Sequence, residues 1–173
     1  MARQEIPDTT VLIKVSRDPR TWPEFERWLS TGRVWLSSIV AAEVFAGAIL
    51  PDDVKFAELM YRAAEKNGRL LVPTAEEHKR AGHIIRRYLQ RFGRLGPKDH
   101  LSDVLILVSA ARLKGTVVTS NQKHFEKWAK IDAESGLDVT VAAPLFEEAT
   151  EVTKRRKRKA PLQPMRRRTR RRH

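Results

Sequence analysis

Residues 100–125 read HLSDVLILVSAARLKGTVVTSNQKHF, and this stretch decides the fold. From Asp103 onward the chain is mostly apolar, which predicts a helix over 103–114 that is capped by Ser102 and ends at Gly115. The β-branched run TVVTS that follows predicts a strand. A helix joined to a strand by so short a turn is typical of α/β proteins.

The rest of the chain repeats this alternation. Apolar spacing and cap residues predict further helices, and short apolar runs predict further strands. Together they indicate an α/β fold with a short parallel sheet flanked by helices. The expected helices cover 19–30, 39–50, 51–67, 74–92 and a short segment around 125–128, and the expected strands cover 33–36, 69–73 and 137–142.

Composition bounds the class of protein. The chain has 173 residues, of which 41% are hydrophobic, so it has room for one domain with a core. It has no cysteine, which excludes disulfides, thiolate zinc sites and a cysteine nucleophile. No apolar run is long enough to span a membrane, and the N-terminus lacks the apolar stretch of a signal peptide. We therefore expect a soluble, cytoplasmic protein with no membrane partner.

The net charge of +13 belongs to the C-terminus. Residues 154–173 hold 12 of the 34 Lys and Arg residues and no acid, which leaves 22 basic against 21 acidic residues before them. We expect a folded domain over 1–150 and a disordered basic tail over 151–173 that binds nucleic acid through phosphates. A tail without function is the alternative. The expected contacts are Lys154, Arg155, Arg156, Lys157, Arg158, Lys159, Arg166, Arg167 and Arg168.

Four polar side chains fall near the expected carboxyl ends of strands, where open α/β sheets place their ligands. Each has a simpler interpretation: Asp8 as a turn or cap, Asp103 as a partner of the helix dipole, Asn121 as a turn residue. Glu43 lies in the otherwise apolar run IVAAEVFAGAIL, where an unpaired carboxylate would be costly unless a surface stripe holds it. The set, more than any member, indicates a site.

Three carboxylates gathered in one cleft would repel one another unless a cation lay between them. Oxygen ligands of this kind suit Mg²⁺ or Mn²⁺. A cation held in this way can activate water and stabilise the transition state of a phosphodiester.

The order and spacing of four segments resemble the PIN-domain ribonucleases, particularly the VapC-like toxins of toxin–antitoxin pairs. The segments are DTTVLI at 8–13, AAEVFAGA at 41–48, SDVLILVSAARLKGTVVTSN at 102–121 and HF at 124–125. The resemblance spans about residues 5–143 and implies a PIN-like three-layer fold.

The resemblance implies a metal-dependent endoribonuclease that leaves a 5′-phosphate and a 3′-hydroxyl. Asp8, Glu43 and Asp103 would hold Mg²⁺ or Mn²⁺, Asn121 would complete the site directly or through water, and Thr119 would orient groups nearby. It also implies an RNA substrate, a homodimer and a cognate antitoxin protein whose C-terminal segment inhibits the site.

The chain departs from the family pattern at two positions. Pro7 lies where the family has a central strand, and proline cannot donate to a ladder, so we expect a short or distorted first strand. His124 stands where many relatives have an acid, and we expect it at the surface. We also expect His100, in the loop before the helix, to be solvated. These departures support an alternative, a noncatalytic nucleic-acid-binding protein with a degenerate PIN-like body and a working tail.

Overall fold

The computed structural model describes residues 3–93, 100–133 and 139–144. Within them the chain alternates short strands with longer helices, as the sequence predicts. The elements are β1 (Glu5–Pro7), α1 (Thr9–Arg17), a 3₁₀ turn (Pro19–Thr21), α2 (Trp22–Ser30), β2 (Leu36–Ser37), α3 (Ser38–Gly47), α4 (Pro51–Lys66), β3 (Leu70–Leu71), α5 (Ala75–Phe92), α6 (Leu101–Arg112), β4 (Thr116–Val118), α7 (Gln122–Ala133) and β5 (Thr140–Ala142).

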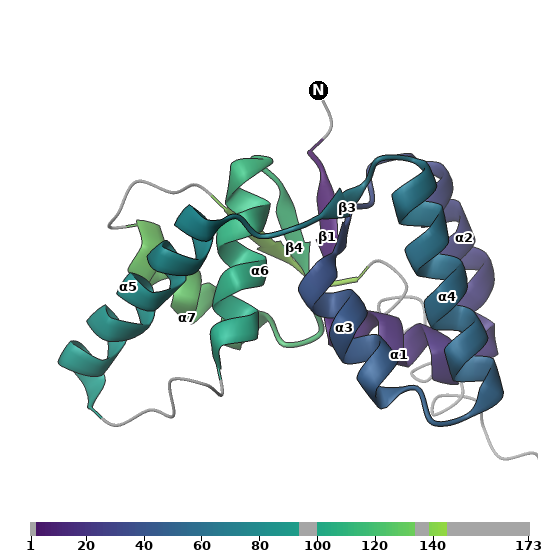
Figure 1. The fold of residues 1–173 in the computed structure, drawn as a ribbon, viewed down its shortest axis with the longest axis horizontal. Coiled ribbons are helices and arrows are strands. Elements are labelled where there is room, and N and C mark those ends of the chain that lie inside the picture. The colour runs from purple at the N-terminus through teal and green to yellow at the C-terminus, as the bar shows by residue number, and fades with distance from the viewer. Residues whose placement is uncertain (1–2, 94–99, 134–138, 145–173) are drawn as a thin grey trace, which may run out of the picture.

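The strands are parallel and lie in the middle of the molecule. β1 pairs with β4, β4 with β5, and β2 with β3. A single bridge between Glu5 and Val34 joins the two sets, so the spatial order is β3-β2-β1-β4-β5. Helices α5, α6 and α7 lie to one side of β1 and α1 to α4 to the other (Figure 1). The predicted α/β fold with a short parallel sheet is confirmed.

Pro7 ends the central strand without breaking it. The Glu5 N–H donates to the Arg33 carbonyl on the β2 side, and the Asp8 N–H donates to the Val118 carbonyl on the β4 side. Along β1 the backbone N–H and C=O groups of successive residues point alternately to β2 and to β4, so the Pro7 nitrogen faces β2. The hydrogen bonds between β1 and β2 stop before Pro7, so its missing N–H leaves no bond unmade. The strand is therefore short, as expected, yet it still places Asp8 at the sheet edge.

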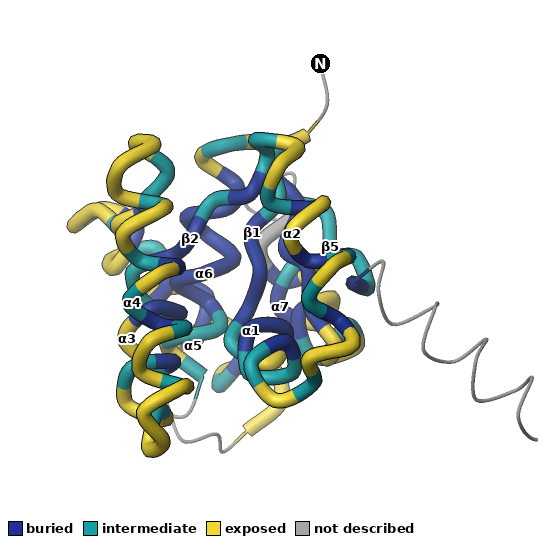
Figure 2. The backbone as a smooth tube through the Cα atoms, turned by 90° about the vertical axis from the view of Figure 1, so that its right-hand side faces the viewer, coloured by how far each residue is buried: buried dark blue, intermediate teal, exposed yellow. Residues whose placement is uncertain are grey.

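Helix α6 is the centre of the core. Every residue from Val104 to Ala111 is buried, as an all-round apolar helix requires. The backbone tube is dark blue through β1 and α6 and exposed on the outer side of α4 (Figure 2). The prediction that Ser102 caps this helix is wrong. The helix begins at Leu101, and His100 is its N-cap residue, without a side-chain cap bond.

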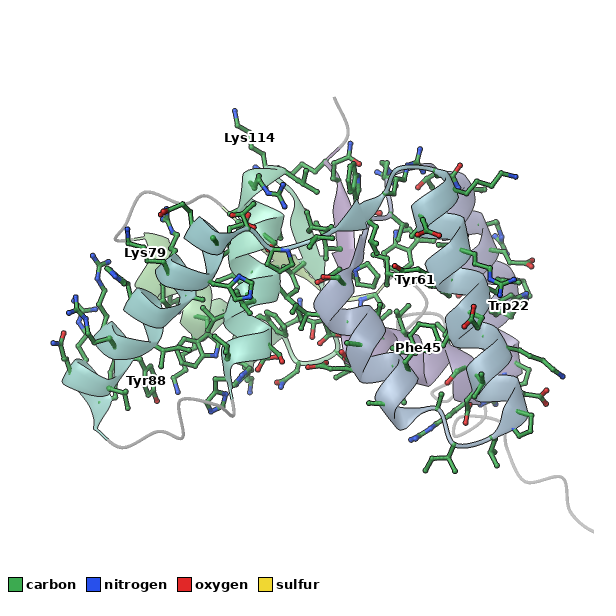
Figure 3. The ribbon with its side chains drawn as sticks, viewed as in Figure 1. Trp22, Phe45, Tyr61, Lys79, Tyr88 and Lys114 are labelled. Atoms are coloured by element: carbon green, nitrogen blue, oxygen red, sulfur yellow. The ribbon has the colours of Figure 1, made fainter. Side chains whose placement is uncertain are left out.

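Aromatic packing fixes α3 against α4. The rings of Phe45 and Tyr61 meet edge to face with centroids 6.1 Å apart (Figure 3). Ser37 starts α3, because its hydroxyl accepts the Ile39 N–H at 3.3 Å. The start and the packing of α3 together set the position of Glu43.

Two expectations depend on other parts of the chain. Within the described residues, no helix is long and apolar enough to cross a membrane. The predicted basic tail, with its nucleic-acid contacts and the boundary at residue 150, lies outside the described residues.

Candidate metal centre at the sheet edge

Two parallel strands end side by side and bring Asp8 and Thr119 together. Pro7 of β1 is in register with Val118 of β4, and Asp8 and Thr119 are the next residues on each chain. The Thr119 hydroxyl donates to Asp8 Oδ2 at 2.6 Å. Thr119 is fully buried, so this bond is shielded from water. The carboxyl ends of the strands thus form the site, as the topology rule for open sheets predicts.

Asp8 is a buried carboxylate held by neutral donors. It is 4% exposed, and its Oδ1 accepts the Val11 N–H at 3.2 Å and the Thr10 hydroxyl at 2.7 Å. Asp8 is therefore the N-cap of α1, as its simpler interpretation predicts. Burial raises the pKa of Asp8 above its ordinary 3.8, the charge of Asp103 raises it further, and the three hydrogen bonds oppose the rise.

Glu43 approaches the same corner from α3. It is half-buried, and its Oε2 accepts a hydrogen bond from the Thr9 hydroxyl. Thr9 directly follows Asp8, so this bond ties Glu43 to the start of α1. Glu43 is therefore satisfied by a partner next to Asp8.

Asp103 lies in the first turn of α6, and the charge interaction with Asp8 places it near that carboxylate. Its side chain is 30% exposed. His124 Nε2 lies 2.8 Å from Asp103 Oδ2, and His100 Nδ1 lies 3.9 Å from the same oxygen. A position in the first turn also favours a negative charge through the helix dipole.

The expectations for both histidines are wrong. The His100 and His124 side chains are each 23% exposed, and their rings lie at an angle of 38° with centroids 5.0 Å apart. The indole of Trp128 lies against both rings. Packing of α7 against α6 brings the two histidines together, and the only local signal was the three-residue spacing of His100 and Asp103, which faces both side chains to one side of a helical turn.

Asn121 is exposed and begins the turn into α7. Its N–H donates to the Thr119 hydroxyl at 2.9 Å, and its carbonyl accepts the N–H groups of His124 and Phe125. Its side chain forms no hydrogen bond with Asp8, Glu43 or Asp103. Thr119 therefore links Asn121 to Asp8 through the backbone, which agrees with an orienting role for the hydroxyl.

The donor set fits a divalent cation. The three hydrogen-bond donors to Asp8 carry no positive charge, so they leave the repulsion between Asp8 and Asp103 uncompensated. Carboxylate oxygens gathered in this way are ligands for Mg²⁺ or Mn²⁺. Among the described residues, however, the side chains whose ligand atoms all lie within 4.8 Å of one another are His100, Asp103 and His124. Asp8, Glu43 and Asp103 do not together form such a group among those residues.

The comparisons with known proteins bear on the fold and the family. No curated protein matches the chain by sequence. The fold is similar to the VapBC complex from Salmonella typhimurium bound to DNA, at 18% identity over 82% of this chain and 98% of that one, with a TM-score of 0.59. It is also similar to FitAB bound to a DNA fragment (23%, 82% and 95%, 0.55) and to VapBC2 from Rickettsia felis bound to promoter DNA (17%, 81% and 98%, 0.54).

Structural similarity at these low sequence identities establishes the fold alone. The family is established by a match of the sequence itself. The model of the PIN domain matches residues 6–131, which begin within β1 and include β4, Asp8, Glu43 and Asp103. The chain belongs to the PIN domain family.

Proposed function

We propose that the protein is a metal-dependent endoribonuclease, the toxin of a toxin–antitoxin pair, acting in the cytoplasm. The observation that carries this is the buried carboxylate Asp8, hydrogen-bonded to Thr119 across the strand ends and affected by the charge of Asp103, in a chain of the PIN domain family. Asp8, Glu43 and Asp103 would hold Mg²⁺ or Mn²⁺, and Asn121 would contribute directly or through a water molecule.

A divalent cation at this position would supply an activated water and offset charge on the phosphodiester in the transition state. The chain's own residues do the positioning. Thr119 and Thr10 hold the two oxygens of Asp8, and Thr9 holds Glu43. Because these donors are short side chains on or beside β1, β4 and α1, they set the carboxylates before any ligand arrives. Attack by water would leave a 5′-phosphate and a 3′-hydroxyl.

The proposal includes a protein partner. Several of the similar structures are VapBC or FitAB complexes, which supports a cognate antitoxin for this chain. Ile49 and Leu50, in the turn between α3 and α4, are 87% and 63% exposed, and Val54 of α4 is exposed nearby. Exposed apolar side chains of this kind are typical of interaction surfaces, so they support a homodimer or an antitoxin contact.

The test is cleavage of an RNA panel by wild type, Glu43→Gln and the control Glu126→Gln. Glu126 is an exposed carboxylate on α7, so both variants lose one charge and only one touches the site. We expect Mg²⁺-dependent cleavage by wild type and control, abolished by chelator, and a loss of at least about 100-fold in Glu43→Gln. Equal rates in all three proteins would refute the proposal.

Truncation after Glu151 separates the nuclease from a tail-driven binder. The nuclease should keep metal-dependent cleavage and bind RNA more weakly. A noncatalytic binder should lose its RNA affinity and show no cleavage in either form.

A further inference from the structure

Three metal-ligating side chains converge beside the acidic corner. His100 precedes α6, Asp103 lies in its first turn, and His124 comes from the first turn of α7. One ligand atom from each lies within 4.8 Å of the other two. His124 Nε2 and His100 Nδ1 lie 2.8 and 3.9 Å from the same oxygen, Asp103 Oδ2.

Protons alone do not satisfy this cluster. A proton shared between His124 Nε2 and Asp103 Oδ2 serves two of the three atoms. His100 Nδ1 then remains buried without a hydrogen-bond partner in the described part of the chain, the one such side-chain atom there. A buried polar atom without a partner is unfavourable, so an atom of this kind points to a missing ligand.

The indole of Trp128 bounds the cluster on one side. Its ring lies beside both imidazole rings, and its N–H is 3.2 Å from His124 Nε2.

We propose that His100 Nδ1, Asp103 Oδ2 and His124 Nε2 bind a divalent transition-metal ion of the zinc class. Tetrahedral Zn²⁺ with bonds of about 2.0–2.1 Å needs ligand atoms about 3.3 Å apart. The distances of 2.8 and 3.9 Å to Asp103 Oδ2 lie on either side of that value, and the ligand atoms of His100 and His124 lie within 4.8 Å of each other. Two imidazoles and one carboxylate favour Zn²⁺ over Mg²⁺, and three protein ligands leave a position open.

This site is separate from the one in the proposed function, although the two share Asp103. Neither histidine belongs to the Asp8–Glu43 corner, and the proposal needs no nuclease activity. Occupancy by a zinc-class ion would draw Asp103 toward the histidines, so the two cations compete for one carboxylate.

The test is isothermal titration calorimetry of the tag-free full-length chain with Zn²⁺ and with Mg²⁺, together with visible absorption spectroscopy of the chain with Co²⁺. We expect one Zn²⁺ per chain, bound more tightly than Mg²⁺, and visible Co²⁺ bands of a tetrahedral site. His100→Gln and His124→Gln should each weaken Zn²⁺ binding at least about tenfold, because even groups behind a ligand have effects of that size. His78→Gln, an exposed histidine of α5, is the matched control.

Zn²⁺ binding that is equal in wild type and both ligand variants, or no tighter than Mg²⁺, would overturn the site. Imidazole NMR signals of the wild-type chain give a measurement free of any folding defect in the variants. Zn²⁺ should shift the His100 and His124 signals and leave His78 and His83 in place, and the opposite pattern contradicts the proposal. Glu43→Gln should keep Zn²⁺ binding, so a failure of the nuclease proposal is recognised separately.

Discussion

Replacement of Thr119 by valine removes the contact that joins the two strand ends. Valine has nearly the shape of threonine, so the fully buried side chain still fills its place, but the 2.6 Å hydrogen bond to Asp8 is lost. Asp8 keeps the Thr10 hydroxyl and the Val11 N–H. The N–H of Asn121 also loses its acceptor, and because Asn121 is exposed it can turn to water.

The size of the effect follows from the charge of Asp8. A hydrogen bond to a charged group contributes about 1.5–3 kcal/mol and a neutral one about 1 kcal/mol. The pKa of Asp8 in the folded chain lies above 3.8, mainly because of burial, so its ionisation lowers stability as the pH rises through that range. The Thr119 bond opposes this loss. Thr119→Val should therefore cost about 1.5–3 kcal/mol at neutral pH and nearer 1 kcal/mol where Asp8 is protonated.

Urea unfolding of wild type and variant between pH 4 and pH 8, without divalent cations, measures this difference. Thr116→Val is the control, since Thr116 is buried at the other end of β4 and its hydroxyl has no hydrogen-bond partner among the described residues. The control should cost less than about 1 kcal/mol at every pH. A cost of Thr119→Val that is the same at both ends of the range, or that grows toward low pH, would refute the reasoning.

Three further predictions concern the cation, the core and the tail. Mg²⁺ at 100 times its dissociation constant should raise the stability of the wild type by about 2.7 kcal/mol in thermal melts. Asp8→Asn should remove that gain, and in chelator the variant should be more stable than the wild type. A variant that Mg²⁺ stabilises as much as the wild type would contradict Asp8 as a ligand. Gly115→Ala should lower the free energy of unfolding in urea by about 1–3 kcal/mol, because the added Cβ would lie 2.6 Å from Ile6 Cδ1 and 3.1 Å from the Gln4 carbonyl oxygen. An unchanged stability would contradict the tight packing of β1 on this turn. Removal of residues 152–173 should lower RNA affinity in filter binding and weaken its dependence on salt, since each lost phosphate contact reduces the slope of log K against log salt concentration by about 0.7. An unchanged slope would exclude the tail as an RNA contact.

The sequence predicts the stretch around α6 and β4 well because its signals are local. A continuous apolar run, a glycine and a β-branched run each predict their element without help from distant residues. The family segments give the order of Asp8, Glu43, Asp103 and Thr119 along the chain, and the parallel register of β1 and β4 explains why Asp8 and Thr119 meet.

The histidine cluster was missed because it depends on tertiary packing. His100 and His124 are brought together by the contact of α7 with α6 and by the indole of Trp128, and no periodicity in one segment reports that contact. The start of α6 also differs from the prediction: Ser102 is a favourable cap by type, yet His100 is the N-cap residue and the helix begins at Leu101, two residues before the predicted start at Asp103. Strands β2 and β3, of two residues each, are shorter than their apolar runs. β2 loses its ladder to β1 beyond Glu5, at the level of Pro7.

The chemistry of the RNA ends tests the central claim most directly. If carboxylates at the ends of β1 and β4 hold the cation that activates water, cleavage in Mg²⁺ leaves 5′-phosphates and 3′-hydroxyls and stops in chelator. Mass spectrometry of the RNA fragments, with and without chelator, identifies the chemical groups at their ends and measures the dependence of cleavage on the cation. Fragments that carry a 2′,3′-cyclic phosphate and a 5′-hydroxyl, formed equally well in chelator, would show that the attacking group is the ribose hydroxyl and would contradict the account.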